Sequence, residues 1–193
     1  VIDFTNVIAG PFATMILADQ GADVIKVEAP QRPDYTRQAG YGPNDLRAVF
    51  LNNNRNKRSI AIDVKNKEGK EALKKLVATA DVFIQNFRPG VVERLGISEP
   101  ELRAITPDLI YVSMSGWGEN GPLSHKPVYD PIIQALSGLA TVQAGSDKDR
   151  PRLIRTILPD KLTGVTAAQA VTAALAGRAK TGEGQHVKIS MLD

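Results

Sequence analysis

Short apolar runs alternate along this chain with longer segments of helical periodicity. Runs of roughly four to eight apolar or β-branched residues, bounded by turn-forming residues, are typical of strands. We therefore predict strands at residues 1–4, 22–27, 59–64, 81–85, 109–114 and 186–191, with residues 152–157 as a further candidate.

The segments between these runs carry the signals of helices. Gly10-Pro11 begins a helix at residues 10–19, and Ser98, followed by Glu and Pro, begins another. An alanine-rich helix runs from Pro159 to about residue 175. Further helices are predicted at residues 66–78, 89–95 and 130–139, and residues 29–54 are predicted as mostly loop with an apolar island at 48–51. This alternation predicts an α/β fold, a doubly wound, Rossmann-like parallel sheet with helices on both faces.

Composition and charge narrow the classes of function. Hydrophobic residues make up 42% of the chain and charged residues 23%, which is a globular balance. The formal charge of +3 comes from residues spread along the chain, so no nucleic-acid partner is expected. No segment has the roughly 18 consecutive apolar residues of a membrane-spanning helix, so no membrane partner is expected either.

Residues that commonly bind metals are scarce. The chain contains no Cys, which excludes disulfides, thiolate catalysis and Cys-ligated zinc. His125 and His186 are the only histidines and lie far apart in sequence, so no metal site is expected. The lack of Cys and of a secretory leader favours a cytoplasmic location. Because residue 1 is Val and the last residues resemble part of a strand, we expect the chain to be a fragment.

Two glycine-rich motifs resemble nucleotide-binding loops without fulfilling them. Residues 116–121 match G-x-G-x-x-G after a predicted strand, but Pro122 and a polar stretch follow where a helix should begin. An NAD site is therefore not expected, and we predict a glycine loop. Gly177 and Gly182 have the spacing of a P-loop but lack its Lys and Ser or Thr, so we predict a helix-ending turn.

Asp160 is the candidate reactive side chain of this sequence. It lies in the first turn of the long predicted helix, where free N–H groups and the helix dipole favour the ionised carboxylate. An ionised carboxylate can act as a nucleophile, although Asp is also a common helix cap. Gly164, Ala167 and Ala168 follow on the same helix, and these small residues fit either a ligand or a closely packed helix.

The whole chain resembles the class III CoA-transferases, a family that includes formyl-CoA and carnitine CoA-transferases. The resemblance is specific because many short motifs occur in the same order. They are Asp3-Phe4-Thr5 with Ala9-Gly10-Pro11, residues 21–28, Asn56-Lys57-Arg58-Ser59 with Asp63, Asp81-Val82, residues 86–90, residues 116–122, Tyr129-Asp130, Pro159-Asp160 and residues 181–185.

This resemblance implies a mechanism and a set of site residues. Asp160 aligns with the family's catalytic aspartate, which forms an aspartyl anhydride and then an aspartyl-CoA thioester. The substrates would be acyl-CoA and small carboxylic acids, with no tightly bound cofactor and no metal. The residues that the resemblance assigns to coenzyme A are Lys65, Asn86, Phe87, Arg94 and Arg58.

The resemblance also implies a domain organisation. Residues 1–193 would be the N-terminal, CoA-binding, Rossmann-like domain, truncated, with the small C-terminal domain absent. The family takes its glycine-rich oxyanion loop from the later part of the chain, so this fragment alone is expected to be inactive. The intact protein is expected to be an interlocked homodimer. The family's Gly-Asp before an Arg appears here as Pro33-Asp34 before Arg37, so no phosphate contact is assigned to Arg37.

Two alternatives remain open from the sequence. α-Methylacyl-CoA racemase shares the fold and the aspartate but needs a second acid/base, a histidine. Tyr129 stands where that histidine should be, and His125 lies four residues earlier. The other alternative is a non-catalytic CoA-binding module.

Overall fold

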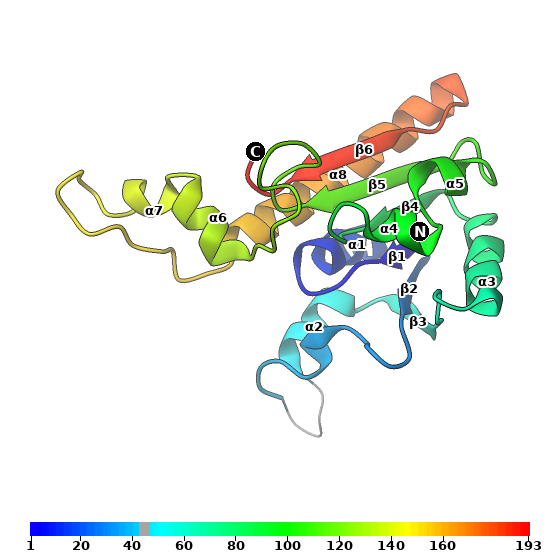
Figure 1. Cartoon of the computed structure of the whole chain (residues 1–193), viewed down its shortest axis with the longest axis horizontal. Coiled ribbons are helices and arrows are strands. Elements are labelled where there is room, and N and C mark those ends of the chain that lie inside the picture. The colour runs from blue at the N-terminus through cyan, green and yellow to red at the C-terminus, as the bar shows by residue number, and fades with distance from the viewer. Residues whose placement is uncertain (43–46) are drawn as a thin grey trace.

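The computed structural model describes residues 1–42 and 47–193 and contains one six-stranded parallel sheet (Figure 1). The strand order is β3-β2-β1-β4-β5-β6, which is the order of a doubly wound nucleotide-binding fold. The predicted fold class is therefore confirmed. The strands are β1 (Ile2–Phe4), β2 (Val24–Glu28), β3 (Lys57–Ala61), β4 (Val82–Gln85), β5 (Ile110–Ser115) and β6 (His186–Ser190).

Helices cover both faces of this sheet. Helices α1 (Ala9–Asp19) and α8 (Leu158–Thr181) pack on one face, where they bury Ile84 and Val112. Helices α3 (Lys67–Val77), α4 (Val91–Leu95) and α5 (Glu99–Arg103) pack on the other, over Phe83 and Tyr111. Side chains alternate between the two faces of a strand, so each central strand contributes to both cores.

The sheet order reverses between β1 and β4. These strands are hydrogen-bonded neighbours, with Phe4 opposite Gln85, although the chain visits β2 and β3 between them. At such a switch point the connections leave in opposite directions, which opens a crevice at the carboxyl ends of the strands. The segments that follow Phe4 and Gln85 meet there.

One predicted strand is wrong. Residues 152–157 form no strand in the structure. The backbone N–H of Ile154 and the carbonyl of Thr156 instead bond the side chain of Gln134, and the N–H of Arg152 bonds the Ala140 carbonyl. An extended segment whose hydrogen bonds are taken by a side chain and a helix end cannot join a sheet.

Several boundaries also differ from the predictions. The strand predicted at 59–64 spans Lys57–Ala61, and Ile62 and Val64 lie buried beyond its end. The long helix continues to Thr181, where Gly182 ends it with a φ of 73°. The helix predicted at 130–139 is broken at Gly138 into α6 (Asp130–Leu136) and α7 (Leu139–Val142).

The loop predicted at residues 29–54 contains short helical elements. The apolar island at 48–51 begins α2 (Ala48–Asn54), and Tyr35–Arg37 forms the 3-10 helix η1. The part of that prediction at residues 43–46 lies outside the described residues.

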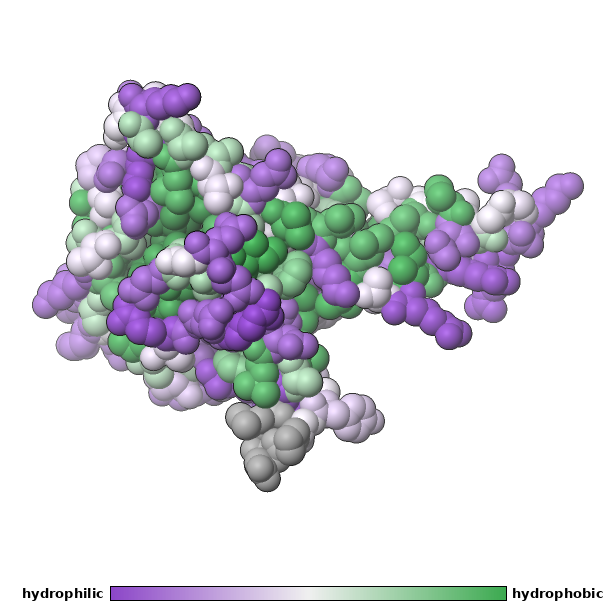
Figure 2. All heavy atoms as spheres, turned by 180° about the vertical axis from the view of Figure 1, so that it is seen from behind, coloured by the Kyte–Doolittle hydropathy of each residue, from purple (hydrophilic) through white to green (hydrophobic). Residues whose placement is uncertain are grey.

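Helices α6 and α7 form an arm that projects from the body of the protein (Figure 1). Seen from behind, hydrophobic side chains continue from the body along the base of this arm (Figure 2). Exposed apolar residues of the arm and of the adjoining surface of α8 are Ile132, Leu136, Val142, Leu153, Leu162 and Val165. Among the described residues, no helix combines the length and the apolar character needed to cross a membrane.

Candidate active site

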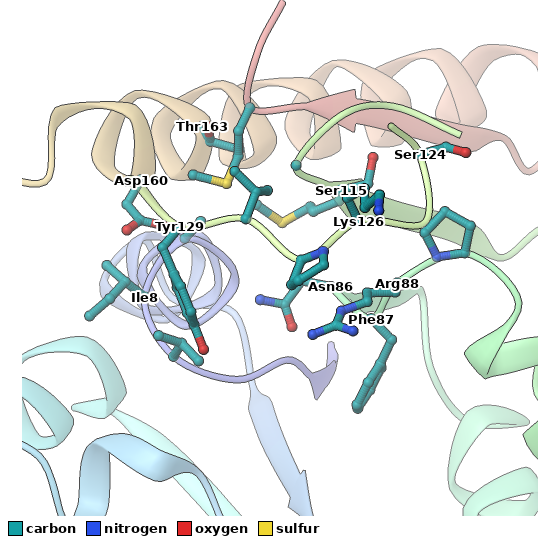
Figure 3. Close-up of a pocket in the computed structure, with 18 residues that line it drawn as sticks. Ile8, Asn86, Phe87, Arg88, Ser115, Ser124, Lys126, Tyr129, Asp160 and Thr163 are labelled. Carbon is teal, nitrogen blue, oxygen red and sulfur yellow. The ribbon is translucent and has the colours of Figure 1, made fainter. Parts of the chain in front are cut away.

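A pocket of about 190 Å³ lies at the switch point, and Asp160 faces it (Figure 3). Its walls come from the segments after β1, β4 and β5 and from the first turn of α8, so residues far apart in sequence meet there. The residues that line it include Val7, Asn86, Phe87, Arg88, Lys126, Tyr129 and Asp160.

The first turn of α8 is anchored by a second acidic residue. The backbone N–H of Asp160 donates to Oδ2 of Asp130 at 3.1 Å. The other oxygen of Asp130 accepts from Nε2 of Gln134 at 2.6 Å, and the Asp130 side chain is buried. Pro159 precedes Asp160 and has no N–H to satisfy, which suits the start of a helix.

The environment of Asp160 raises the pKa of its carboxyl to about 6. Burial is the main cause, and the negative charge of Asp130 adds to it, while the backbone N–H of Ala9 acts in the opposite direction. The sequence predicted that the helix terminus would favour the ionised form. In the folded protein, burial and the charge of Asp130 have the larger effect and favour the protonated form. With a pKa of about 6, this carboxyl is mostly ionised near pH 7 although it is poorly solvated.

The small residues of α8 provide a seat for helix α1. A Cβ atom on Gly164 would lie 2.9 Å from the carbonyl oxygen of Ala9 and 2.8 Å from Cδ1 of Phe12. Ala167 is fully buried in the same contact. This answers the question left open by the sequence, because the first turns of both helices touch here and bring the Ala9 N–H toward Asp160.

The turn after β1 is tied to the segment after β4 by Asn86. Oδ1 of Asn86 accepts from the Asn6 N–H at 2.9 Å, and its Nδ2 donates to the Asn6 carbonyl at 2.8 Å. Asn86 therefore joins the two strands on either side of the switch point. In Figure 3 its amide lies across the pocket from Asp160.

A second pocket of about 270 Å³ lies beyond Phe87, at the ends of β1 and β2. Phe87 and Lys65 line it together with apolar residues that include Val27 and Leu95. Phe87 also lines the Asp160 pocket, so the two hollows share one wall. The structure thus brings three of the sequence-predicted residues, Lys65, Asn86 and Phe87, to one edge of the sheet.

The remaining predicted residues lie elsewhere. Arg94 is exposed on α4 and lines neither of these two pockets. Arg58 is near the amino end of β3, where its guanidinium pairs with Asp23, the residue before β2. This pair lies at the amino ends of the strands, whereas the two pockets lie at their carboxyl ends. Arg37, left unassigned by the sequence, makes two hydrogen bonds to the buried carboxylate of Glu28 and lies 3.8 Å from the ring centre of Phe50.

Sequence reasoning missed several residues in and around the site. Asp130 was part of a recognised motif but had no assigned role, and Arg88 and Lys126 were not selected. Neither Arg88 nor Lys126 forms an ion pair with an acidic group of residues 1–42 or 47–193. The sequence offered one signal for Arg88, which is that it closely follows the carboxyl end of a strand. Ligands of doubly wound sheets bind at that end.

His125, the residue that a racemase would need, is exposed. It is not among the residues that line the Asp160 pocket, although its neighbours Ser124 and Lys126 are. Tyr129 lines the pocket and is 69% exposed.

The chain is thus an α/β protein with a doubly wound sheet and a poorly solvated carboxylate at the switch point, the place where such sheets commonly bind ligands. The family model for CoA-transferase family III matches residues 1–193, and the chain belongs to that family.

Individual relatives agree with this assignment. The chain is 43% identical to the acetyl-CoA:oxalate CoA-transferase of Acetobacter aceti, over all of this chain and 50% of that protein. It is 42% identical to the succinyl-CoA:glutarate CoA-transferase of Mus musculus, over all of this chain and 44% of that protein. A crystal structure of a CAIB/BAIF family protein from Brucella suis superposes with a TM-score of 0.93 at 38% identity, covering all of this chain and 52% of that one. The chain thus spans about half the length of the relatives it matches.

Proposed function

We propose that the protein transfers coenzyme A from an acyl-CoA to a carboxylic acid, with Asp160 as the nucleophile. The Asp160 carboxylate attacks the thioester carbonyl of the donor, the carbon–sulfur bond breaks, and CoA leaves as a thiolate. The product on the protein is a mixed anhydride. The thiolate then attacks the aspartyl carbonyl and releases the donor as a free carboxylate, which leaves an aspartyl-CoA thioester.

The second half of the reaction reverses these steps. The acceptor carboxylate attacks the aspartyl thioester, expels the CoA thiolate and forms a new anhydride. The thiolate attacks the acceptor carbonyl of that anhydride, which yields the new acyl-CoA and restores the Asp160 carboxylate. Every intermediate is an activated acyl group, so no ATP is consumed.

One observation carries this proposal: a carboxylate with a pKa of about 6 faces a pocket at the switch point of the sheet. Such a group is ionised at neutral pH and poorly solvated, which favours attack on a neutral thioester. The Ala9 N–H beside it is a donor in a fixed position, of the kind that stabilises developing negative charge.

The second pocket provides a place for the CoA portion of the substrate. Its apolar wall, which includes Phe87, suits an adenine ring or the pantetheine arm, and Lys65 at its rim can pair with a phosphate. Because Phe87 separates the two pockets, a pantetheine chain passing this ring would bring its thioester toward Asp160. We include Arg94, at the periphery of the site, as a contact to a CoA phosphate. Arg58 lies at the amino ends of the strands, away from both pockets, so its position does not support a contact with CoA.

We further propose that the acceptor acid is a small dicarboxylate. Arg88 and Lys126 line the Asp160 pocket without an acidic partner among the described residues, so they are available for an anion. One carboxylate of the acid would react at Asp160 while a cation of this pair holds the other. The two relatives named above are named for the acceptors oxalate and glutarate, which are both dicarboxylates, whereas their donors are acetyl-CoA and succinyl-CoA.

We also propose that the intact protein is a homodimer. The support is the row of exposed apolar side chains on the projecting arm and on α8 (Figure 2). Large contiguous apolar patches are uncommon on the surfaces of monomers.

Racemisation of an α-methylacyl-CoA is the competing reaction, because a carboxyl with a pKa of about 6 also suits proton transfer. Proton abstraction and return on opposite faces of the α-carbon require a second acid/base. His125 is exposed and does not line the pocket, which favours transfer.

The test is to incubate the intact protein with candidate acyl-CoA donors and acids and to follow exchange by mass spectrometry. Wild-type protein should carry a CoA adduct on the peptide that contains Asp160, and hydroxylamine should convert that adduct to an aspartyl hydroxamate. Asp160→Asn should show neither. Transfer that persists in Asp160→Asn contradicts the proposal, and incorporation of solvent deuterium at the α-carbon without exchange of acids supports the racemase instead.

A further inference from the structure

Several backbone groups of the turn between β1 and α1 are bonded by side chains that are distant in sequence. Nζ of Lys26 donates to the Thr5 carbonyl at 2.9 Å, and Oδ1 of Asp34 accepts from the Val7 N–H at 3.3 Å. Asn86 binds both backbone groups of Asn6 between them. Buried backbone groups must find partners, so these side chains decide the path of the turn.

Val7 lies in this turn with a φ of 72°, in the left-handed region. A β-branched residue rarely adopts this conformation because its side chain clashes with the backbone. Such a residue persists only where its surroundings over-determine it, and strain of this kind gathers at functional sites. Val7 also lines the Asp160 pocket.

Lys26 and Asp34 form one buried unit against this turn, and neither lines the Asp160 pocket. Lys26 Nζ lies 3.0 Å from Oδ2 of Asp34, and both side chains are at most 1% exposed. Asp34 Oδ1 also accepts from the N–H and the hydroxyl of Thr36, at 2.9 and 2.7 Å. The pair therefore holds the turn by a carbonyl on one side of Asn6 and by an N–H on the other.

The turn leads directly into the first N–H groups of α1. Ala9 is the first residue of that helix, and its N–H is the backbone group that lowers the pKa of Asp160. The other charged groups around this carboxyl are Asp130, which anchors the first turn of α8, and Arg88 and Lys126 in the pocket wall. A displaced turn would move the Ala9 N–H and leave the other groups in place.

We infer that Asp34, paired with Lys26, is a positioning residue for the reaction at Asp160. It fixes Val7 in the left-handed conformation and thereby aims the Ala9 N–H at the Asp160 carboxyl. Asp34 itself does not line the Asp160 pocket, so it acts through the turn. This inference uses the proposed role of Asp160 for its activity readout only.

The test compares wild-type intact protein with Asp34→Asn. The single oxygen of Asn can still accept from the Val7 N–H, but its NH2 group then faces the Lys26 ammonium, so the ion pair is lost. The Asp160 pKa, followed by the ¹³Cγ signal of labelled aspartate and assigned with Asp160→Asn, should rise by roughly half a unit or more. The rate of acyl-enzyme formation should fall by about tenfold to a hundredfold.

The double variant Asp34→Asn/Val7→Gly tests the strained turn itself. Glycine adopts a positive φ without a steric penalty, so the turn should need Asp34 less. The double variant should recover a large part of both the pKa and the rate. Recovery no better than in Asp34→Asn alone contradicts the inference.

Leu102→Ala is the matched control for general destabilisation, because Leu102 is fully buried in the core on the other face of the sheet. It should lower the unfolding temperature and leave the Asp160 pKa unchanged. A folded Asp34→Asn protein with wild-type pKa and rate, or a Leu102→Ala protein with the same shift, overturns the inference. The NMR titration remains valid if Asp160 proves not to be the nucleophile, so the two proposals fail separately.

Discussion

The backbone N–H of Asp160 donates to the buried carboxylate of Asp130 at 3.1 Å. This contact joins the beginning of α8 to the beginning of α6, and it has two physical consequences. It satisfies an N–H group of the first helical turn that has no partner within the helix. It also places a negative charge beside Asp160, which raises the pKa of the Asp160 carboxyl.

Replacement of Asp130 by Asn should therefore lower the pKa of Asp160 from about 6 toward the ordinary value of 3.8. The acid limb of the rate of acyl-enzyme formation should move to lower pH by the same amount, as measured by quenched-flow mass spectrometry. The variant should also be less stable by about 1–3 kcal/mol, because an amide cannot accept from both Asp160 and Gln134. An acid limb that stays in place would show that Asp130 does not set this pKa.

Asp160→Asn should stabilise the protein while abolishing transfer. The folded pKa of about 6 exceeds the unfolded value near 3.8, so ionisation of Asp160 costs folding free energy above pH 6. Below the unfolded pKa both states are protonated and the cost disappears. After allowance for solvent screening of this half-buried group, we expect a gain of about 1–2 kcal/mol at pH 7 that shrinks toward pH 4. Urea unfolding at both pH values measures it, and an equal gain at both would contradict this origin.

Gly164→Ala should separate helices α1 and α8. The added Cβ would lie 2.9 Å from the Ala9 carbonyl oxygen, so one helix must shift, at a cost of about 1–3 kcal/mol. The shift moves the Ala9 N–H, so acyl-enzyme formation should fall as well. Gly177→Ala on the same helix is the control, because its Cβ would come only to 3.4 Å of the flexible Gln185 side chain. That change should stabilise the helix by up to about 1 kcal/mol.

Lys65→Ala and Arg58→Ala should have different effects on acyl-CoA binding. Lys65 lines the second pocket, whereas Arg58 pairs with Asp23 at the amino ends of the strands. Loss of a phosphate contact of about 1–2 kcal/mol should raise the KM for acyl-CoA roughly fivefold to thirtyfold in Lys65→Ala. Steady-state kinetics of Arg58→Ala should match wild type, and a comparable rise there would restore Arg58 as a CoA contact.

Lys126→Met should weaken the use of dicarboxylates selectively. A charged hydrogen bond to the second carboxylate is worth about 1.5–3 kcal/mol, so the KM for a dicarboxylate acceptor should rise by about tenfold or more. A monocarboxylate of similar length lacks that contact, and its KM should change little. Equal changes for both acids would remove Lys126 from acceptor recognition.

Local features of this protein can be predicted from its sequence. The alternation of strands with amphipathic helices shows in its hydrophobic periods, because each period depends on neighbours a few residues apart. Pro159 marks the start of α8 for the same reason, which placed Asp160 in a first helical turn. The short motifs and their order along the chain were enough to indicate the protein family.

Properties that depend on residues distant in sequence could not be predicted in this way, because they arise from the folded arrangement. The sign of the pKa shift at Asp160 follows from burial and from Asp130, thirty residues away along the chain, and not from the local helix terminus. Residues 152–157 had an extended pattern, yet Gln134 took their hydrogen bonds. The left-handed Val7 is held by Asp34, which no local pattern connects to it. Periodicity records which side of an element is buried, whereas charge, strain and register depend on which element covers it.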